Sequence, residues 1–180
     1  MEEKINIAEI LKDKKNGLRL YSPIFGECAF CYVREDTNDI CVKKQNGVIE
    51  YFNSEGLYFA LGEVMLFPSK SMRDWEKFSW KRGDVLISDC GFVCIFKEWA
   101  SDDYTRFNGC YFDGMPNAQT AKYSKLDNNT AYGYIRELEK RCGGVLNIKT
   151  LKIEKPEFKD GDVLFVKCKD STFIEIFKYS

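Results

Sequence analysis

Carboxylate and thiol side chains are the residues of this sequence whose types and spacing could do chemistry. The 180 residues include no histidine, which removes Ser–His and Cys–His catalytic pairs and the common mixed zinc sites. Acid–base catalysis near neutral pH would then depend on carboxylates, Lys, Tyr or Cys. The chain also has no Walker loop and no Gly-x-Gly-x-x-Gly run. We therefore predict that it is not an enzyme and that it uses no cofactor.

Two pairs of aspartates could act as chemical groups. Asp84 and Asp162 each follow a glycine at the opening of a β-branched run, and Asp102 and Asp103 are adjacent. A Gly-Asp opening is typical of a turn in which the Asp side chain accepts a hydrogen bond from the local backbone. Because neither pair has a third ligand at a defined spacing, we expect turn and surface roles and no metal site.

Eight cysteines could suggest disulfides or zinc. Cys28 and Cys31 have the spacing of half a zinc site, but residues three apart on a strand point to opposite faces. The best second pair, Cys90 and Cys94, has a four-residue spacing that fits poorly. Residues 1–4 lack the basic region of a secretory signal, so we expect a cytoplasmic location in a bacterial host cell, where thiols stay reduced. Free cysteines, mostly in the core, are predicted.

A repeated pattern organises the elements that must position these groups. Residues 80–97 contain an aromatic residue, a Gly-Asp turn, a β-branched run, a polar turn and a second apolar run that ends in Phe-Lys. The same order returns in residues 158–178. This pattern predicts two β-hairpins, each inside a small antiparallel barrel or sandwich.

The first half of the chain combines one helix with short strands. Asn6 can cap a helix over residues 5–15, and Gly17 can end it in the left-handed conformation. The strands expected here cover residues 18–21, 26–33, 38–44, 48–52, 57–60 and 64–67. Asn46-Gly47 predicts a hairpin with a type I′ turn, because this pair tolerates positive φ at both central positions.

Residues 69–78 are predicted to form a helical connector that ends the first half. Ser69 or Ser71 can cap it, and Trp75 and Phe78 lie three apart on one face. The connector has no Gly or Pro between its ends. We expect its two aromatic side chains to pack against a barrel and the two halves to touch.

The second half contains the longest helical pattern. After a strand at 104–112 and a loop at 113–117, Asn128 or Asn129 can cap a helix that ends at Gly143. Its apolar stripe and its i,i+4 ion pair are predicted to comprise Ala131, Tyr134, Ile135, Leu138 and Cys142, and Glu137 with Arg141. A small hairpin is expected at residues 146–153.

These elements predict an α+β fold that is mainly antiparallel β, built as two small SH3-like barrel or sandwich halves with short helices. The N-terminal half covers residues 1–79 and starts with the short helix. The C-terminal half covers residues 80–180 and contains the inserted helix at about 128–142.

Composition restricts the class of partner. A net charge of −1 and a pI near 5.7 do not favour nucleic acid, and no apolar run approaches the ~20 residues that span a bilayer. Aromatic residues make up 15% of the chain, which the cores of small barrels can explain. Alternatively, some of them form a binding patch, because Tyr and Trp dominate protein interfaces. The candidates for that patch are Tyr21, Phe25, Tyr58, Tyr104, Phe107 and Tyr111.

Several phrases of the sequence resemble a known family. They are residues 20–27, residues 66–70 with Arg73-Asp74-Trp75, and the Phe-Lys-x-Gly-Asp opening at 158–162. The family comprises uncharacterised small β-rich proteins from gut anaerobic bacteria, their phages and mobile elements. The helix and small hairpin also resemble a module of the form Leu-x-x-Leu-x-x-x-Gly-x-x-Trp-Asn, in which Leu146 stands at the Trp position. The resemblance implies an accessory gene of a phage or mobile element and brings no reaction, ligand or catalytic residue.

Three functions follow, in order of preference. The first is a non-catalytic protein-binding accessory protein of a phage or mobile element, which could inhibit a host factor. The second is a structural or assembly component of a phage particle, in which small β-domains pack by their edges. The third is a cysteine-dependent enzyme. The sequence leaves the oligomeric state open.

Overall fold

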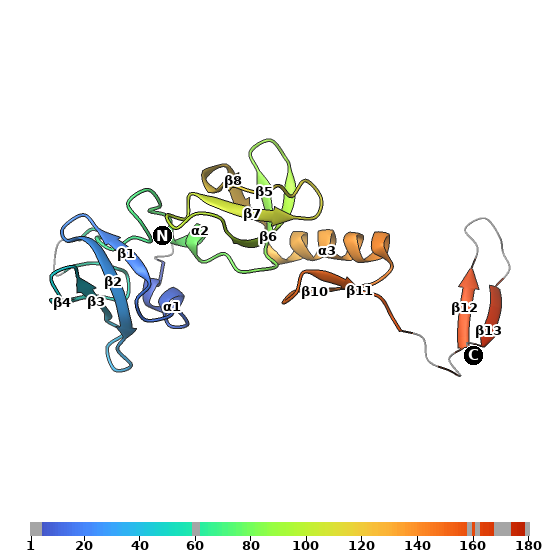
Figure 1. Cartoon of the computed structure of the whole chain (residues 1–180), viewed down its shortest axis with the longest axis horizontal. Coiled ribbons are helices and arrows are strands. Elements are labelled where there is room, and N and C mark those ends of the chain that lie inside the picture. Colours follow the sequence, from blue (N-terminus) through green and yellow to red (C-terminus); the bar gives the residue numbers. More distant parts are fainter. Residues whose placement is uncertain (1–4, 59–61, 158–159, 161–162, 168–173, 179–180) are drawn as a thin grey trace. The chain divides into compact units, whose positions relative to one another are not determined.

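The computed structural model describes residues 5–58, 62–157, 160, 163–167 and 174–178 (Figure 1). Antiparallel strands dominate and the helices are few, which confirms the predicted α+β class. The chain divides into two compact units, Met1–Ala131 and Tyr132–Ser180. The predicted domain boundary at residue 79 falls inside the first unit, between its two sheets, and stays a prediction.

The first sheet has the strand order β1-β2-β3-β4. Its strands are β1 (Arg19–Ser22), β2 (Gly26–Val33), β3 (Ile40–Lys44) and β4 (Ile49–Phe52). Helix α1 (Ile7–Leu11) packs on this sheet, and the Asn6 side chain accepts a hydrogen bond from the Glu9 amide, as predicted for its cap. The buried core comprises Ile7, Ala8, Leu11, Leu20, Cys28, Phe30, Ile40, Val42, Phe52, Leu66, Trp75 and Phe78.

The predicted hairpin at residues 38–52 is confirmed, but its turn type is not. Lys43 pairs with Ile49, and the Gly47 amide donates to the Lys44 carbonyl over 2.9 Å. Gly47 has φ of 84°, while Asn46 has no positive φ. The hairpin is closed by a three-residue loop, residues 45–47, whereas a type I′ turn has a two-residue loop. The loop is therefore a type I turn followed by a left-handed glycine.

The second sheet has the strand order β8-β7-β6-β5-β9. Its strands are β5 (Val85–Ser88), β6 (Val93–Trp99), β7 (Arg106–Cys110), β8 (Ala118–Gln119) and β9 (Tyr123–Lys125). Its core comprises Trp80, Leu86, Cys94, Phe96, Phe107, Ala118 and Tyr123, with Trp99 packed against them. The 3-10 turn η1 (Thr120–Lys122) joins the two edge strands. Four residue steps reach at most about 14 Å, whereas five flat strands span about 19 Å, so this sheet must curl.

Three predicted strands of the first unit, at 57–60, 64–67 and 104–112, differ from the structure. Segments 57–58 and 62–67 are not strands, and they contribute single bridges between Leu57 and Val64 and between Tyr21 and Phe67. Residues 59–61 lie outside the described part. The strand expected at 104–112 is shorter, because Tyr104 and Tyr111 have φ of 61° and 58°, which no strand residue adopts.

Helix α2 (Trp75–Phe78) connects the two sheets, and its cap is Asp74 rather than Ser69 or Ser71. The Ser69 hydroxyl instead donates to the Asp103 carbonyl over 2.8 Å and accepts from the Met72 amide, so it holds the loop before the helix. As predicted, both aromatic residues of α2 are buried.

A chain of aromatic rings joins the two cores across this connector. The Phe78 ring lies 5.4 Å from Trp75, 4.9 Å from Tyr104 and 6.5 Å from Trp99. Trp99 stacks on Trp80 at 6.0 Å, inside the second core. Aromatic pairs at these distances stabilise beyond their buried area. The two sheets therefore contact each other through the connector, while the division into halves stays a prediction.

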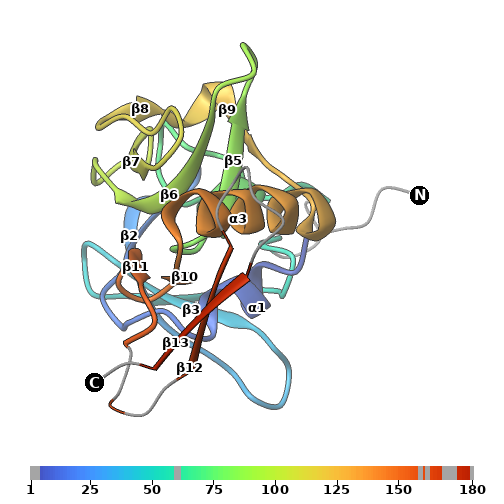
Figure 2. The same cartoon turned by 90° about the vertical axis from the view of Figure 1, so that its right-hand side faces the viewer.

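In the second unit, α3 (Asn128–Cys142) begins just before the boundary and lies beside the hairpin of β10 (Val145–Asn147) and β11 (Lys152–Glu154) (Figure 2). Its cap is Asp127, whose Oδ1 accepts from the Asn129 and Thr130 amides, rather than Asn128 or Asn129. The predicted pair forms, with Arg141 Nε 2.9 Å from Glu137 Oε1. Of the predicted stripe, Leu138 is buried and the other members are half-buried.

Both copies of the repeat form hairpins, with different registers. In the first copy Val85 pairs with Ile95. The second copy consists of β12 (Val163–Lys167) and β13 (Ile174–Lys178), and Val163 pairs with Lys178. Alignment of the two copies would have placed Ile176 opposite Val163. A slip of two residues keeps every side chain on its face, so the alternating pattern cannot distinguish the two registers.

Candidate functional site

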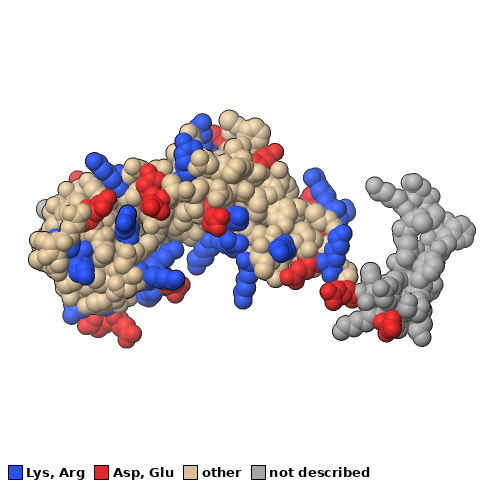
Figure 3. All heavy atoms as spheres, in the orientation of Figure 1, with Lys and Arg blue, Asp and Glu red and all other residues tan. Residues whose placement is uncertain are grey.

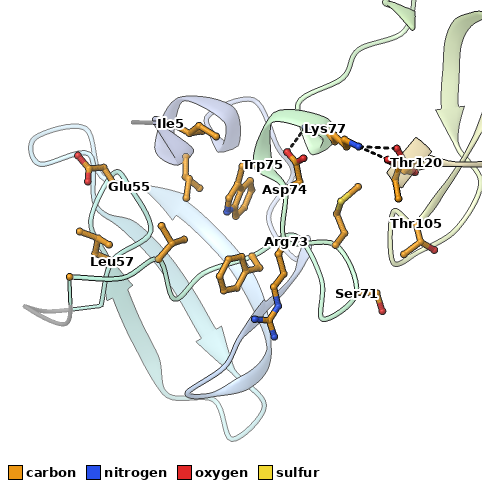
Figure 4. A pocket seen from close by; sticks show the side chains of 16 residues that line it. Ile5, Glu55, Leu57, Ser71, Arg73, Asp74, Trp75, Lys77, Thr105 and Thr120 are labelled. Carbon is orange, nitrogen blue, oxygen red and sulfur yellow. Dashed lines mark hydrogen bonds between the residues drawn. The ribbon is translucent and has the colours of Figure 1, made fainter. Parts of the chain in front are cut away.

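An apolar cleft of about 840 Å³ lies in the first unit between α1, the segments 55–57 and 62–77, the residue before β7, and η1 (Figure 4). Its lining comprises Ile5, Ile7, Glu55, Leu57, Gly62, Val64, Phe67, Ser71, Met72, Arg73, Asp74, Trp75, Lys77, Thr105, Thr120 and Ala121. Clefts of this size with mostly apolar walls are typical binding sites.

Trp75, the first residue of α2, is one of the residues that line the cleft (Figure 4). Asp74 Oδ1 accepts from the Lys77 amide over 3.0 Å, which fixes the first turn of the helix. The indole Nε1–H donates to the Leu66 carbonyl over 2.8 Å. The only polar atom of the indole is therefore satisfied inside the protein, and the ring, which is 3% exposed, belongs to the first core behind the cleft.

The polar groups at the other end of the cleft bind each other across the two sheets. Lys77 Nζ donates to the Ala121 carbonyl over 2.9 Å and to the Thr120 carbonyl over 3.3 Å. The Thr120 hydroxyl donates to the Tyr104 carbonyl over 2.9 Å. This lysine therefore bridges α2 to the second sheet and is not available to a charged ligand.

The cleft carries no excess of either charge. Arg73 and Lys77 balance Glu55 and Asp74, and the Arg73 guanidinium lies over the Phe67 ring, 5.1 Å from its centre. Among the described residues, these side chains belong to no group of three or more that could hold a metal ion. The apolar walls of the cleft can hold an apolar, uncharged group.

The six predicted binding residues lie elsewhere, and none of them lines this cleft. Phe25 and Tyr58 pack edge to face at 4.9 Å against the first core. Tyr104 packs on Phe78 at the junction, while Tyr21 and Tyr111 are half-buried. Their role in binding stays a prediction.

Phe107 contributes no contact area to a partner in this structure. Its side chain is 0% exposed in the second core, where it packs against the rings of Trp80 and Tyr123. Phe107 is therefore a core residue, which agrees with the first explanation of the high aromatic content, core packing.

Sequence reasoning missed the cleft. Its walls come from turns and from residues far apart in the chain, so no helical or strand periodicity in the sequence predicts it. The nearest signal was the pair of large aromatic residues in the predicted connector. That pair predicted the helix and the packing of its buried side, and it did not predict the cleft.

Two of the aspartates singled out in the sequence, Asp84 and Asp103, are occupied by hydrogen bonds. Asp84 Oδ2 accepts from the Lys81 amide, and its Oδ1 lies 2.8 Å from Lys125 Nζ. Its predicted turn role is confirmed, while Asp162 lies outside the described residues. Asp103 Oδ1 accepts from the hydroxyls of Ser101 and Thr105 over 2.7 Å each. These bonds hold the pKa of the Asp103 carboxyl below its usual value.

The seven cysteines in the described part are free thiols. Burial, with a smaller effect of Cys31, raises the pKa of Cys28 to about 11. Burial also raises the pKa of Cys94 to about 12, with Cys110 as the second cause. Thiols with such values are protonated near neutral pH and are weak nucleophiles.

The described residues offer neither a metal-binding cluster nor a membrane-spanning helix. No group of three or more Cys, Asp or Glu side chains there could hold a metal ion. Among the helices described, none is long and apolar enough to cross a membrane.

Comparison with protein-family models, with curated proteins and with solved structures finds no match to this chain.

Proposed function

We propose that this chain is a non-catalytic protein-binding accessory protein of a phage or mobile element, which holds an apolar segment of a host protein in the cleft around Trp75 and so inhibits it. The observation that supports the proposal most is the cleft itself, with its apolar walls and balanced charges. A volume of about 840 Å³ suits several apolar side chains of a partner.

The surface charges agree with a neutral protein partner in the host cytoplasm. Lys and Arg lie among Asp and Glu over the first sheet in the view of Figure 3, so this face has no field of one sign. The carboxylates of Asp84 and Asp103, two of those that could do chemistry, are engaged in turns. Both points favour binding through shape and apolar contact over catalysis or attraction to nucleic acid.

We also propose that both sheets are SH3-like small barrels. In each sheet the fifth extended segment in chain order pairs with the first strand: Phe67 pairs with Tyr21 of β1, and β9 pairs with β5. The Tyr21 amide donates to the Phe67 carbonyl over 2.9 Å, and the Phe67 amide donates to the Tyr21 carbonyl over 2.8 Å. These two bonds support the pairing of the later segment with β1. Two related modules joined by an aromatic connector would leave the cleft between them as the natural binding site.

A pair of matched variants tests the cleft. Val64 lines it and is 39% exposed, while Val48 is 46% exposed on the hairpin turn and does not line it. Val64→Glu places a charge against apolar walls that a bound partner would desolvate, so it should weaken binding at least tenfold, about 1.4 kcal/mol. Val48→Glu should leave affinity unchanged within about twofold.

The assay first isolates the partner and then measures its affinity. Tagged chain captures proteins from lysate of the bacterial host, and the purified partner is titrated against the wild type and both variants by calorimetry. Equal affinity of the wild type and the Val64→Glu variant would remove the cleft from the proposal. A chain that captures nothing and assembles into a closed ring by light scattering would favour the structural or assembly function.

A further inference from the structure

Cys31 is the extra residue of a β-bulge in the first sheet. Phe30 pairs with Val42 and Tyr32 pairs with Cys41, so the register shifts by one residue between these pairs. In a bulge, two residues of one strand oppose a single residue of the other. Phe30 and Val42 are both in the buried core. Strand alternation therefore directs Cys31 to the other face of the sheet, on the side of Cys41.

Cys41 lies beneath two tyrosines on that outer face. It pairs with Tyr32 on β2 and with Tyr51 on β4, and the two tyrosine hydroxyls lie 3.4 Å apart. The tyrosines are 49% and 41% exposed, whereas Cys41 is 1% exposed. The thiol of Cys41 is thus enclosed by its strand neighbours, while Cys31 is half-buried.

The register of the bulge places the two cysteines as neighbours on adjacent strands. Burial raises the pKa of the Cys31 thiol most, and Cys41 is the next cause. The Cys31 thiol itself donates to the Ala29 carbonyl over 3.8 Å. Other cysteines are placed differently. Cys28 belongs to the first core, and Cys94 and Cys110 lie on opposite faces of the second sheet, because Cys110 pairs with Ile95.

We propose that Cys31 and Cys41 form a reversible cross-strand disulfide when the protein meets a low-molecular-weight disulfide such as oxidised glutathione. The deprotonated Cys31 sulfur attacks one sulfur of glutathione disulfide, whose S–S bond breaks, and one glutathione thiolate leaves. The deprotonated Cys41 sulfur then attacks the Cys31 sulfur, and the second glutathione thiolate leaves. Two protein thiols are oxidised, and one glutathione disulfide is reduced to two thiols.

The bond would fix the bulge and the pair of tyrosines above it. It joins β2 to β3 across the turn that connects them, and so restricts the unfolded chain. We expect the melting temperature of the oxidised protein to exceed that of the reduced protein by about 5 °C.

Mass spectrometry of the full chain tests the pair. The reduced protein is incubated with oxidised glutathione at pH 8, its remaining thiols are alkylated, and it is digested with trypsin. The proposal predicts a cross-link between peptides 20–34 and 35–43, with tandem fragmentation placing it at Cys31 and not at Cys28. The cross-link should disappear in Cys31→Ser and persist in the matched control Cys28→Ser.

Three results would overturn the proposal. One is a cross-link that survives Cys31→Ser, and another is a lasting mixed disulfide of glutathione at Cys31. The third is a pair that remains reduced while the exposed Cys90 has reacted. The half-buried Cys31 is the position substituted because a change at the enclosed Cys41 could disturb folding, and the melting temperature of the wild type under both conditions provides a second readout.

Discussion

Asp84 closes the turn that opens the first copy of the repeat, and its substitution separates two contributions to stability. Its carboxylate accepts from the Lys81 amide over 2.8 Å and forms an ion pair with Lys125. Asp84→Asn keeps an oxygen for the amide and removes the charge. Asp84→Ala removes both. We therefore expect the asparagine variant to be the more stable of the two.

The magnitudes follow from the two bonds. Loss of a side-chain acceptor for a turn amide costs about 0.5–2 kcal/mol, by analogy with helix caps. The ion pair is worth about 0.2–1 kcal/mol, because 40% of the Lys125 side chain is exposed to solvent. Asp84→Asn should thus cost at most about 1 kcal/mol, and Asp84→Ala about 1–3 kcal/mol. The melting temperature should fall by about 2–4 °C per kcal/mol.

Thermal and urea unfolding of the wild type and both variants measure these differences. Lys125→Met is the matched control, since it removes the ion pair and leaves the turn bond intact, and it should resemble Asp84→Asn. An asparagine variant as unstable as the alanine variant would refute the reasoning, because the charge would then matter more than the turn. An asparagine variant that melts normally but no longer binds the partner would assign Asp84 to the binding site.

Two further predictions concern the junction and the loop around it. Lys77→Met removes the bridge from α2 to the Thr120 and Ala121 carbonyls and should cost about 1–2 kcal/mol in urea unfolding, whereas Lys70→Met on the exposed surface should change stability by less than about 0.5 kcal/mol. Because hydrogen bonds lower the pKa of Asp103 in the folded state, it contributes stability that is present above its unfolded pKa of about 3.9 and is lost as pH falls through the lower folded value. Asp103→Asn should therefore flatten the acid limb of stability against pH, and an unchanged limb would contradict the assigned bonds.

Local patterns determined the elements whose partners lie a few residues away. Asn6 caps α1 and Glu137 pairs with Arg141, because both contacts join groups within one helical turn. The alternating runs predicted the hairpins at residues 40–52, 85–99 and 145–154. Strand alternation and turn residues can both be recognised in consecutive residues of the sequence. From these the α+β class follows.

Features that depend on distant residues needed the tertiary structure. The Ser69 hydroxyl, a predicted cap of α2, instead donates to the carbonyl of Asp103, 34 residues away. The cleft joins residues from Ile5 to Ala121, and apolar positions that line it look in sequence like any other core position. Likewise, the bulge that brings Cys31 beside Cys41 is a one-residue shift between strands. Strand pairing sets such shifts through long-range packing, and an alternating sequence is compatible with several of them.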